Sequence, residues 1–249
     1  MTIPNTERNF MLLGHRGFRG VLENTLPAFR RALKYADGIE FDVRLTGDRK
    51  LVTLHDGEFR ANGKLYRVRE LTYRELLRLH PHGRLVPRVK DVIKLSPEIL
   101  NADIKDPEVV EKLIEKLERR NLLERTVISA DNLGLALKIQ RECPDCRVGF
   151  SIISARNLLM SLRLMRNVYS IHIPLDLTSY LGVRGVLTLI ELYRRKGLRV
   201  WLWNYRMDEL ALLPELMDRA DAVIADDPAR VKRFISLQPI GIEATRYVG

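Results

Sequence analysis

The sequence has 249 residues, of which 46% are hydrophobic and 30% are charged, and its formal net charge at pH 7 is +10. This length suits one large α/β domain. No apolar run approaches the roughly 18 residues of a membrane span, and residues 1–10 lack the basic and then apolar order of a secretion signal. We therefore expect a cytoplasmic protein with no stable membrane insertion.

The positive charge bears on the class of partner. The chain has 42 Lys and Arg residues but only 32 Asp and Glu residues. This surplus of positive charge favours anionic, phosphate-bearing ligands. The same surplus also fits solvated helix faces such as residues 111–120. Aromatic residues are only 7% and scattered, so no nucleic-acid partner is expected.

Short apolar runs alternate with amphipathic stretches along almost the whole chain. The predicted strands are residues 11–14, 38–43, 100–104, 126–129, 147–151, 170–173, 199–203 and 222–225. The predicted helices are residues 26–35, 107–121, 133–141, 156–166, 186–196, 207–219 and 228–237. Eight strands alternating with helices indicate a (β/α)₈ TIM barrel. An open, doubly wound sheet fits the same alternation, but glycines at positions 14, 17 and 20 do not make its dinucleotide-binding motif.

The alternation is interrupted once, between residues 50 and 96. A polar loop is expected over residues 56–64, followed by two short helical stretches. We find no linker or internal repeat, so we predict a single domain over residues 1–249, with a short insertion after the second strand at about residues 57–79.

Cysteine occurs only at positions 143 and 146, in a turn between a predicted helix and a predicted strand. Two cysteines cannot supply four zinc ligands, and a redox motif is expected at the start of a helix. We interpret Cys143 and Cys146 as structural or incidental thiols in preference to a disulfide.

Charged residues recur two positions apart at the second and third predicted strands, whose C-terminal ends face the catalytic side of a barrel. Glu40 and Asp42 are two positions apart, so their side chains share a face, and Asp103 and Lys105 repeat that spacing. Three converging carboxylates predict a divalent cation, Mg²⁺ or Ca²⁺. Each pair alone has a structural alternative, helix capping for the first and a surface ion pair for the second.

Two histidines flank Glu40 and Asp42 in the sequence. His15 and His55 can each donate or accept a proton near neutral pH. Arg16 and Lys105 offer positive charge to phosphate oxygens. The set predicts in-line displacement at phosphorus.

The remaining histidines and the tryptophans are weaker candidates. His80 and His82 are expected in a turn and not in a metal site. His172 is a candidate for the pocket, although a core position is favoured. Trp203 lies nearer its strand end than Trp201, so it is the better candidate for contact with substrate.

The segment from Gly14 to Asp56 resembles the opening of the glycerophosphodiester phosphodiesterase family, with HRG, ENT, E-x-D-V and HD in order. Residues 101–105 (NADIK), 200–204 (VWLWN) and 223–228 (VIADDP) resemble later family motifs. The resemblance covers most of the chain. It implies a TIM barrel that hydrolyses a small-molecule glycerophosphodiester to sn-glycerol 3-phosphate and an alcohol.

By the resemblance, each matching position takes a role. Glu40, Asp42 and Asp103 would hold the metal, with Mn²⁺ as a further option, and Arg16 and Lys105 would grip phosphate. His55 would be the base and His15 the acid. Glu23 would support or contact the ligand. Asn24 and Thr25 are expected to cap the helix that begins near Leu26.

Some positions depart from the family pattern. Asp103 replaces a glutamate, and Ala225 stands where threonine usually precedes Asp226. Two alternatives therefore stay open: a lysophospholipase D with an apolar mouth lined by Trp203 and Leu202, and a catalytically silent phosphate-ligand barrel. The assembly is also open, with a homodimer as one option.

Overall fold

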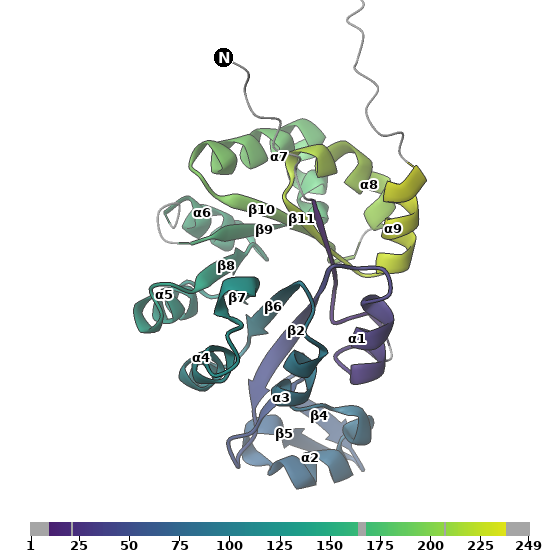
Figure 1. The fold of residues 1–249 in the computed structure, drawn as a ribbon, viewed down its shortest axis with the longest axis vertical. Coiled ribbons are helices and arrows are strands. Elements are labelled where there is room, and N and C mark those ends of the chain that lie inside the picture. The colour runs from purple at the N-terminus through teal and green to yellow at the C-terminus, as the bar shows by residue number, and fades with distance from the viewer. Residues whose placement is uncertain (1–9, 21, 164–167, 207, 238–249) are drawn as a thin grey trace, which may run out of the picture.

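A computed structural model describes residues 10–20, 22–163, 168–206 and 208–237. Its main sheet holds eight parallel strands, which are β1 (Met11–Gly14), β2 (Gly38–Leu45), β6 (Ile99–Ile104), β7 (Thr126–Ala130), β8 (Arg147–Ser151), β9 (Ser170–Pro174), β10 (Arg199–Trp203) and β11 (Ala222–Ala225). Each strand pairs with its neighbour in chain order, and β1 pairs with both β11 and β2, which closes the barrel. The predicted TIM barrel is confirmed (Figure 1).

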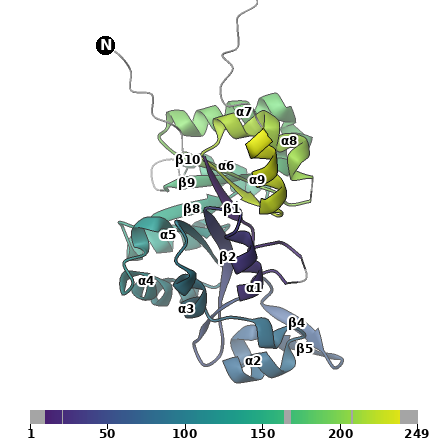
Figure 2. The same cartoon turned by 45° about the vertical axis from the view of Figure 1, so that its right-hand side comes forward.

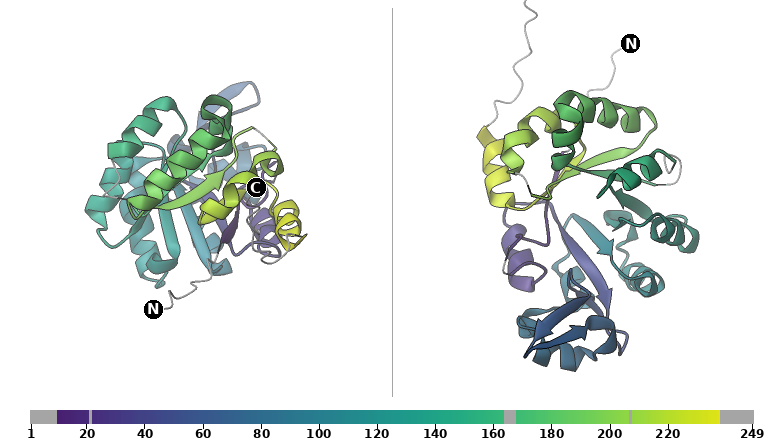
Figure 3. Two further views of the ribbon diagram at one scale, coloured as in Figure 1. Left: turned by 90° about the horizontal axis from the view of Figure 1, so that it is seen from above. Right: turned by 180° about the vertical axis from the view of Figure 1, so that it is seen from behind.

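Helices surround the strands in the views from the front and from behind (Figures 1 and 3). They are α1 (Leu26–Ala32), α4 (Val110–Glu118), α5 (Leu133–Glu142), α6 (Ala155–Arg163), α7 (Thr178–Arg195), α8 (Glu209–Leu216) and α9 (Pro228–Leu237). Helix α7 begins eight residues earlier than predicted and is broken at Gly182, whose φ of 65° is left-handed. The break interrupts the helical spacing of the apolar residues, so the spacing alone did not predict the first turn of α7.

Along β2, residues of the hydrophobic core alternate with residues of the candidate site. Ile39, Phe41 and Val43 belong to the large core between the strands and the helices. Glu40 and Asp42 therefore face the inside of the barrel, because successive side chains of a strand point to opposite sides. A second, smaller core of Leu13, Ile99, Val127, Trp201, Ala222 and Ile224 fills part of that interior.

The segment after β2 forms a small unit that projects from the barrel (Figure 2). Strand β3 (Leu51–Thr53) runs antiparallel to β2, and it is followed by β4 (Glu58–Ala61), β5 (Lys64–Arg67), α2 (Tyr73–Leu79) and α3 (Val89–Val92). The loop expected over residues 56–64 is wrong in part, because β4 and β5 pair as a hairpin. Asn62 and Gly63 have φ of 49° and 73°, as in a type I′ turn, and the Asn-Gly pair was the overlooked signal. The division into one domain with this insertion stays a prediction.

The two cysteines form a disulfide between the end of α5 and the start of β8. The turn after the helix brings their Cα atoms to 5.3 Å, a separation that suits such a bond. The preferred interpretation of free thiols is therefore wrong.

None of the helices in the described ranges is long and apolar enough to cross a membrane.

Candidate active site

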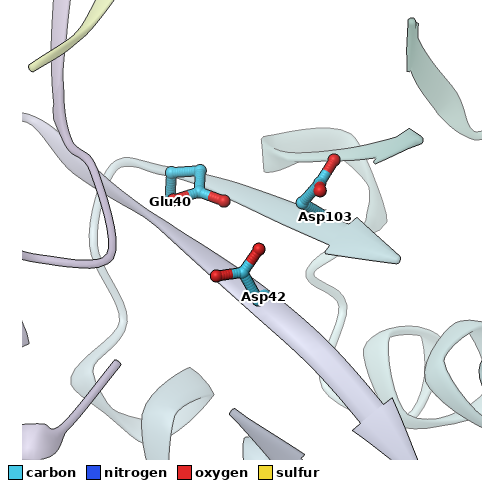
Figure 4. A group of neighbouring side chains, drawn as sticks. All are labelled: Glu40, Asp42 and Asp103. Atoms are coloured by element: carbon cyan, nitrogen blue, oxygen red, sulfur yellow. The ribbon is translucent and has the colours of Figure 1, made fainter. Parts of the chain in front are cut away.

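Three acidic side chains meet inside the barrel, from two neighbouring strands. Asp42 of β2 is paired in register with Asp103 of β6, and Glu40 lies two residues before Asp42. One carboxylate oxygen of each residue lies within 4.8 Å of the others (Figure 4). The predicted convergence of these carboxylates is thus present in the structure.

Burial and mutual repulsion change the pKa values of these carboxyl groups. Burial, and then the charges of Asp42 and Asp103, raise the pKa of Glu40. Burial also acts to raise the pKa of Asp42, but the positive charges of Lys105 and Arg16 outweigh it and hold that pKa below its ordinary value. The net effect is that Asp42 stays ionised while the Glu40 carboxyl resists ionisation.

Two cations partly neutralise the carboxylates. Lys105 Nζ lies 3.0 Å from Asp42 Oδ1 and 2.5 Å from Asp103 Oδ2. Arg16 Nε lies 3.0 Å from Asp42 Oδ2, as an ion pair without hydrogen-bond geometry. Despite burial, Asp103 and Asp42 raise the pKa of Lys105, so its side chain stays charged. Three carboxyl groups face these two cations, so ionisation of Glu40 as well as Asp42 and Asp103 would leave a surplus of negative charge.

The chemistry of this donor set fits a divalent cation. Carboxylate oxygens are the ligands that Mg²⁺, Ca²⁺ and Mn²⁺ prefer. A cation among Glu40, Asp42 and Asp103 would offset the repulsion that raises the pKa of Glu40. These three residues are the candidate ligands.

The turn after β1 aims Arg16 at this cluster. The backbone N–H of Arg16 donates to Glu40 Oε2 at 2.8 Å, and its Nη1 donates to Glu23 Oε1 at 2.5 Å. Arg16 adopts a left-handed φ of 50°. At Gly17, which has a φ of 82°, a Cβ would lie 2.7 Å from the backbone of Ala28, so only glycine fits this turn.

Asn24 supports Asp42, and its predicted role as a helix cap is wrong. Its Nδ2 donates to Asp42 Oδ2 at 2.8 Å, and its Oδ1 accepts the backbone N–H of Asp42 at 3.1 Å. Thr25 alone caps α1, with its side chain accepting from Ala28. The left-handed φ of Asn24, 58°, turns its side chain away from the helix start.

His15 is held by a residue that the sequence analysis did not include in the site. Its Nδ1 lies 2.6 Å from Asp226 Oδ1, and its Nε2 lies 3.9 Å from Glu40 Oε2. Burial acts to raise the pKa of Asp226, but the hydrogen bond and the charge of His15 lower it below its ordinary value. An ionised carboxylate can only accept, so Nδ1 of His15 carries the proton and Nε2 faces the carboxylates.

Asp226 is in turn held from several loops. Its Oδ2 accepts from Arg19 Nη1 at 3.0 Å and from Asn204 Nδ2 at 3.1 Å, while its backbone N–H donates to Glu209. Asp226 directly follows β11, at the same strand ends as the other groups. That position was the signal that could have placed it in the site.

His55 lies on the insertion side of the cluster. Its Nδ1 is 2.8 Å from Asp56 Oδ1, and its backbone carbonyl accepts from Arg44 Nε at 2.8 Å. Its side chain is 42% exposed. The backbone N–H of Leu54, the residue before His55, donates to the backbone carbonyl of Asp42 at 3.2 Å, so the chain brings His55 next to the carboxylates.

Ser129 positions Asp103. Its hydroxyl donates to Asp103 Oδ1 at 2.7 Å and accepts from Asn101 Nδ2 at 3.2 Å. Ser129 is fully buried on β7, next to β6. The shorter side chain of Asp103 is thus fixed on one oxygen by Ser129 and on the other by Lys105.

The aromatic candidates separate clearly. Trp203 is half-buried, with its ring 6.4 Å from that of His15 and 6.0 Å from that of Tyr205. Leu202 is 0% exposed, so the expected lining of the mouth by Leu202 is wrong. On a strand, Leu202 and Trp203 must point to opposite faces.

His172 is a core residue. It stacks on Trp201 and its Nε2 lies 2.9 Å from Ser170 Oγ. Burial lowers its pKa to about 4. His80 and His82 lie in the turn after α2. In the described part of the chain, neither belongs to the group of Glu40, Asp42 and Asp103 that could hold a metal ion.

Comparisons with known proteins agree with this geometry. Residues 15–230 match the model of the glycerophosphoryl diester phosphodiesterase family. The chain belongs to this family. It is 29% identical over 241 residues to a glycerophosphodiester phosphodiesterase of Caldanaerobacter subterraneus subsp. tengcongensis, covering 88% of this chain and 94% of the relative.

Solved structures of the glycerophosphoryl diester phosphodiesterase family share the fold. A glycerophosphodiester phosphodiesterase from Thermotoga maritima is 26% identical, with a TM-score of 0.73 over 92% of this chain and 98% of that chain. A phosphodiesterase from Oleispira antarctica, solved with sn-glycerol-3-phosphate, has a TM-score of 0.70 at 22% identity, covering 91% of this chain and 96% of that one. The chain is thus an enzyme of this family, as the sequence motifs predict.

Proposed function

We propose that this enzyme hydrolyses glycerophosphodiesters to sn-glycerol 3-phosphate and an alcohol with the help of a divalent cation. The observation that carries the proposal is the convergence of Glu40, Asp42 and Asp103 beside Arg16, Lys105 and His15. The name of the Caldanaerobacter relative supports the activity, and the product bound to the Oleispira phosphodiesterase supports the product.

In this proposal Glu40, Asp42 and Asp103 hold Mg²⁺ or Ca²⁺, with Mn²⁺ as a third option. A bound cation supplies positive charge to the phosphoryl oxygens as they become more negative. Lys105 and Arg16 provide further positive charge for the phosphate, and Glu23 orients Arg16 through their 2.5 Å contact. Trp203 packs beside His15 and offers an apolar wall to the substrate.

The proposed chemistry needs one base and one acid. His55 takes the proton of the glycerol 2-hydroxyl while that oxygen attacks phosphorus, and the bond between phosphorus and the alcohol oxygen breaks. His15 gives its Nε2 proton to the departing alcohol, and Asp226 stabilises the positive ring before this transfer. Water then attacks the cyclic phosphate, which opens to sn-glycerol 3-phosphate.

The test is turnover by the purified protein of glycerophosphocholine, glycerophosphoethanolamine and a lysophospholipid, each with Mg²⁺, Ca²⁺, Mn²⁺ or a chelator. We expect metal-dependent release of sn-glycerol 3-phosphate from the diesters. Activity on the lysophospholipid alone would transfer the assignment to a lysophospholipase D. Turnover that persists without any metal would contradict the mechanism, and no turnover at all would leave a binding protein.

Substitution of the two histidines tests the roles. We expect His15→Ala and His55→Ala to abolish turnover and to leave the barrel folded. His82→Ala, which changes an exposed histidine outside the cluster, is the matched control and should keep full activity. A folded His15→Ala or His55→Ala variant with normal turnover would contradict the proposed acid and base.

A cytoplasmic location and a homodimer complete the proposal. The location rests on the sequence, and the homodimer is one option for the assembly. Cell fractionation tests the first and light scattering the second.

A further inference from the structure

A cavity of about 320 Å³ lies beside the candidate active site, on the side of the insertion. Three arginines, Arg44, Arg67 and Arg69, line it together with two carboxylates, Glu58 and Asp106. Its volume is at the lower end of the range for small-molecule sites. The lining therefore favours a small anion.

Arg44 connects this cavity to the candidate metal ligands. Glu40, Asp42 and Arg44 occupy alternate positions of β2 and share one face, with Arg44 nearest the C-terminal end. Positions two apart on a strand are separated by roughly 7 Å. Strand β2 runs from the barrel toward the β4–β5 hairpin (Figures 1 and 2). The cavity is thus one step beyond Asp42 along the same strand.

The Arg44 side chain is held in place but has donors to spare. Its Nε donates to the carbonyl of His55 and its Nη1 donates to Asp106, both at 2.8 Å. A Cβ on Gly57 would lie 3.0 Å from Nη1, so the glycine leaves space for the guanidinium. These bonds use two of five N–H donors, which leaves three for a ligand.

The other two arginines are weakly engaged. Arg67 is 52% exposed and lies 3.5 Å from Glu58 and 3.4 Å from Glu70, distances typical of weak surface pairs. Within the described residues, the Arg69 side chain forms no ion pair or hydrogen bond. Both can turn toward an anion at little cost.

We propose that this cavity binds a second phosphate of the substrate, one small polyol away from the phosphate that reacts. The inference rests on the proposed function and narrows its substrate class to glycerophosphodiesters that carry two or more phosphates. Guanidinium groups match phosphate oxygens with paired, charge-assisted hydrogen bonds. With the reacting phosphate beside Asp42 and Asp103, a phosphate at the far end of a glycerol unit would follow β2 to Arg44, roughly 7 Å further along the strand. Arg69 lines the same cavity.

The test compares two substrates that differ by one glycerol phosphate unit. These are bis(glycerophospho)glycerol, the deacylated form of cardiolipin, and glycerophosphoglycerol. We expect kcat/KM to be about tenfold higher for the first, beyond the factor of two from its two equivalent diesters. Because both phosphates flank its central glycerol, this substrate tests the cavity whichever side of the reacting phosphate faces it.

Three variants locate the effect, and Arg60→Gln is the charge-matched control for Arg69→Gln. Arg69→Gln, or Arg67→Gln with Arg69→Gln, should lower the ratio of the two kcat/KM values toward two. Arg60→Gln removes an exposed arginine of the same hairpin that does not line the cavity, so it should keep the ratio. A wild-type ratio of two or less, or an unchanged ratio in the double variant, would overturn the proposal.

A binding measurement separates this inference from the proposed function. Calorimetry with bis(glycerophospho)glycerol in chelator reports affinity without turnover. Arg69→Gln should weaken binding about tenfold relative to Arg60→Gln. If no substrate is turned over but Arg69→Gln still binds more weakly than Arg60→Gln, only the proposed function is contradicted. If wild type and Arg69→Gln bind equally well, only the second phosphate site is contradicted.

Discussion

Nδ1 of His15 lies 2.6 Å from Oδ1 of Asp226, a residue 211 positions later in the chain. This contact fixes the ring so that Nε2 points toward Glu40. It makes Asp226 a positioning residue for the proposed acid, since its carboxylate holds the His15 ring.

We predict that Asp226→Asn lowers kcat by on the order of 10²- to 10⁴-fold with a smaller change in KM. An amide can offer its NH₂ group to Nδ1 and favour the wrong tautomer. The pH profile of kcat should change shape, which a purely structural loss would not cause. Asp227→Asn, a change in the neighbouring residue that bonds the backbone of Arg230, is the control. An Asp226→Asn profile identical to that of Asp227→Asn would refute the role.

Asn24 should tune the affinity for metal. We predict that Asn24→Gly weakens binding of Mg²⁺ or Mn²⁺ about 10- to 100-fold, because Asp42 loses both of its contacts with this side chain. Glycine tolerates the left-handed φ, so the change isolates the side chain. Calorimetric titration measures the affinity. Asn132→Gly, which removes a helix cap on α5, controls for loss of stability, and an equal loss of metal affinity there would contradict the prediction.

His172 should make the fold sensitive to acid. Burial lowers its pKa to about 4, below the roughly 6.5 of an unfolded chain, so the unfolded state binds the proton first as pH falls. The free energy of unfolding should therefore be highest above pH 6.5. It should fall by about 3 kcal/mol between pH 6.5 and pH 4, because the unfolded state gains a proton there and the folded state does not.

Urea unfolding at several pH values measures this effect. His172→Phe keeps a ring against Trp201 and cannot titrate, so its stability should fall less steeply between pH 6.5 and 4 than that of the wild type. His82→Gln, at an exposed position, should follow the wild type. Parallel curves for wild type and His172→Phe would count against the assignment.

The disulfide should affect stability and not catalysis. It joins the end of α5 to the start of β8, at the N-terminal ends of the strands, opposite the carboxylates. We predict that changing Cys143 and Cys146 to serine lowers the free energy of unfolding by up to about 2 kcal/mol, the value for so short a loop. Reductant should reproduce the loss in the wild type and have no effect on the variant. If the folded serine variant also lost turnover, the prediction that the disulfide affects stability and not catalysis would be wrong.

The sequence by itself determined the barrel and much of the candidate site. Periodicity located the eight strands, because each must bury one face against helices and the other inside the barrel. The spacing of Glu40 and Asp42 placed both on one face of β2, and strand ends placed Asp103 and His15 at the same rim. These features are local, so residue type and position suffice to predict them.

Only the tertiary structure decided which distant groups meet. Closure of β11 against β1 brings Asp226 to His15, and the pairing of β2 with β6 sets Lys105 against two carboxylates. The hairpin brings Arg67 to Arg44. Periodicity reports whether a residue is buried but not which remote segment covers it, because that choice depends on how the whole chain closes.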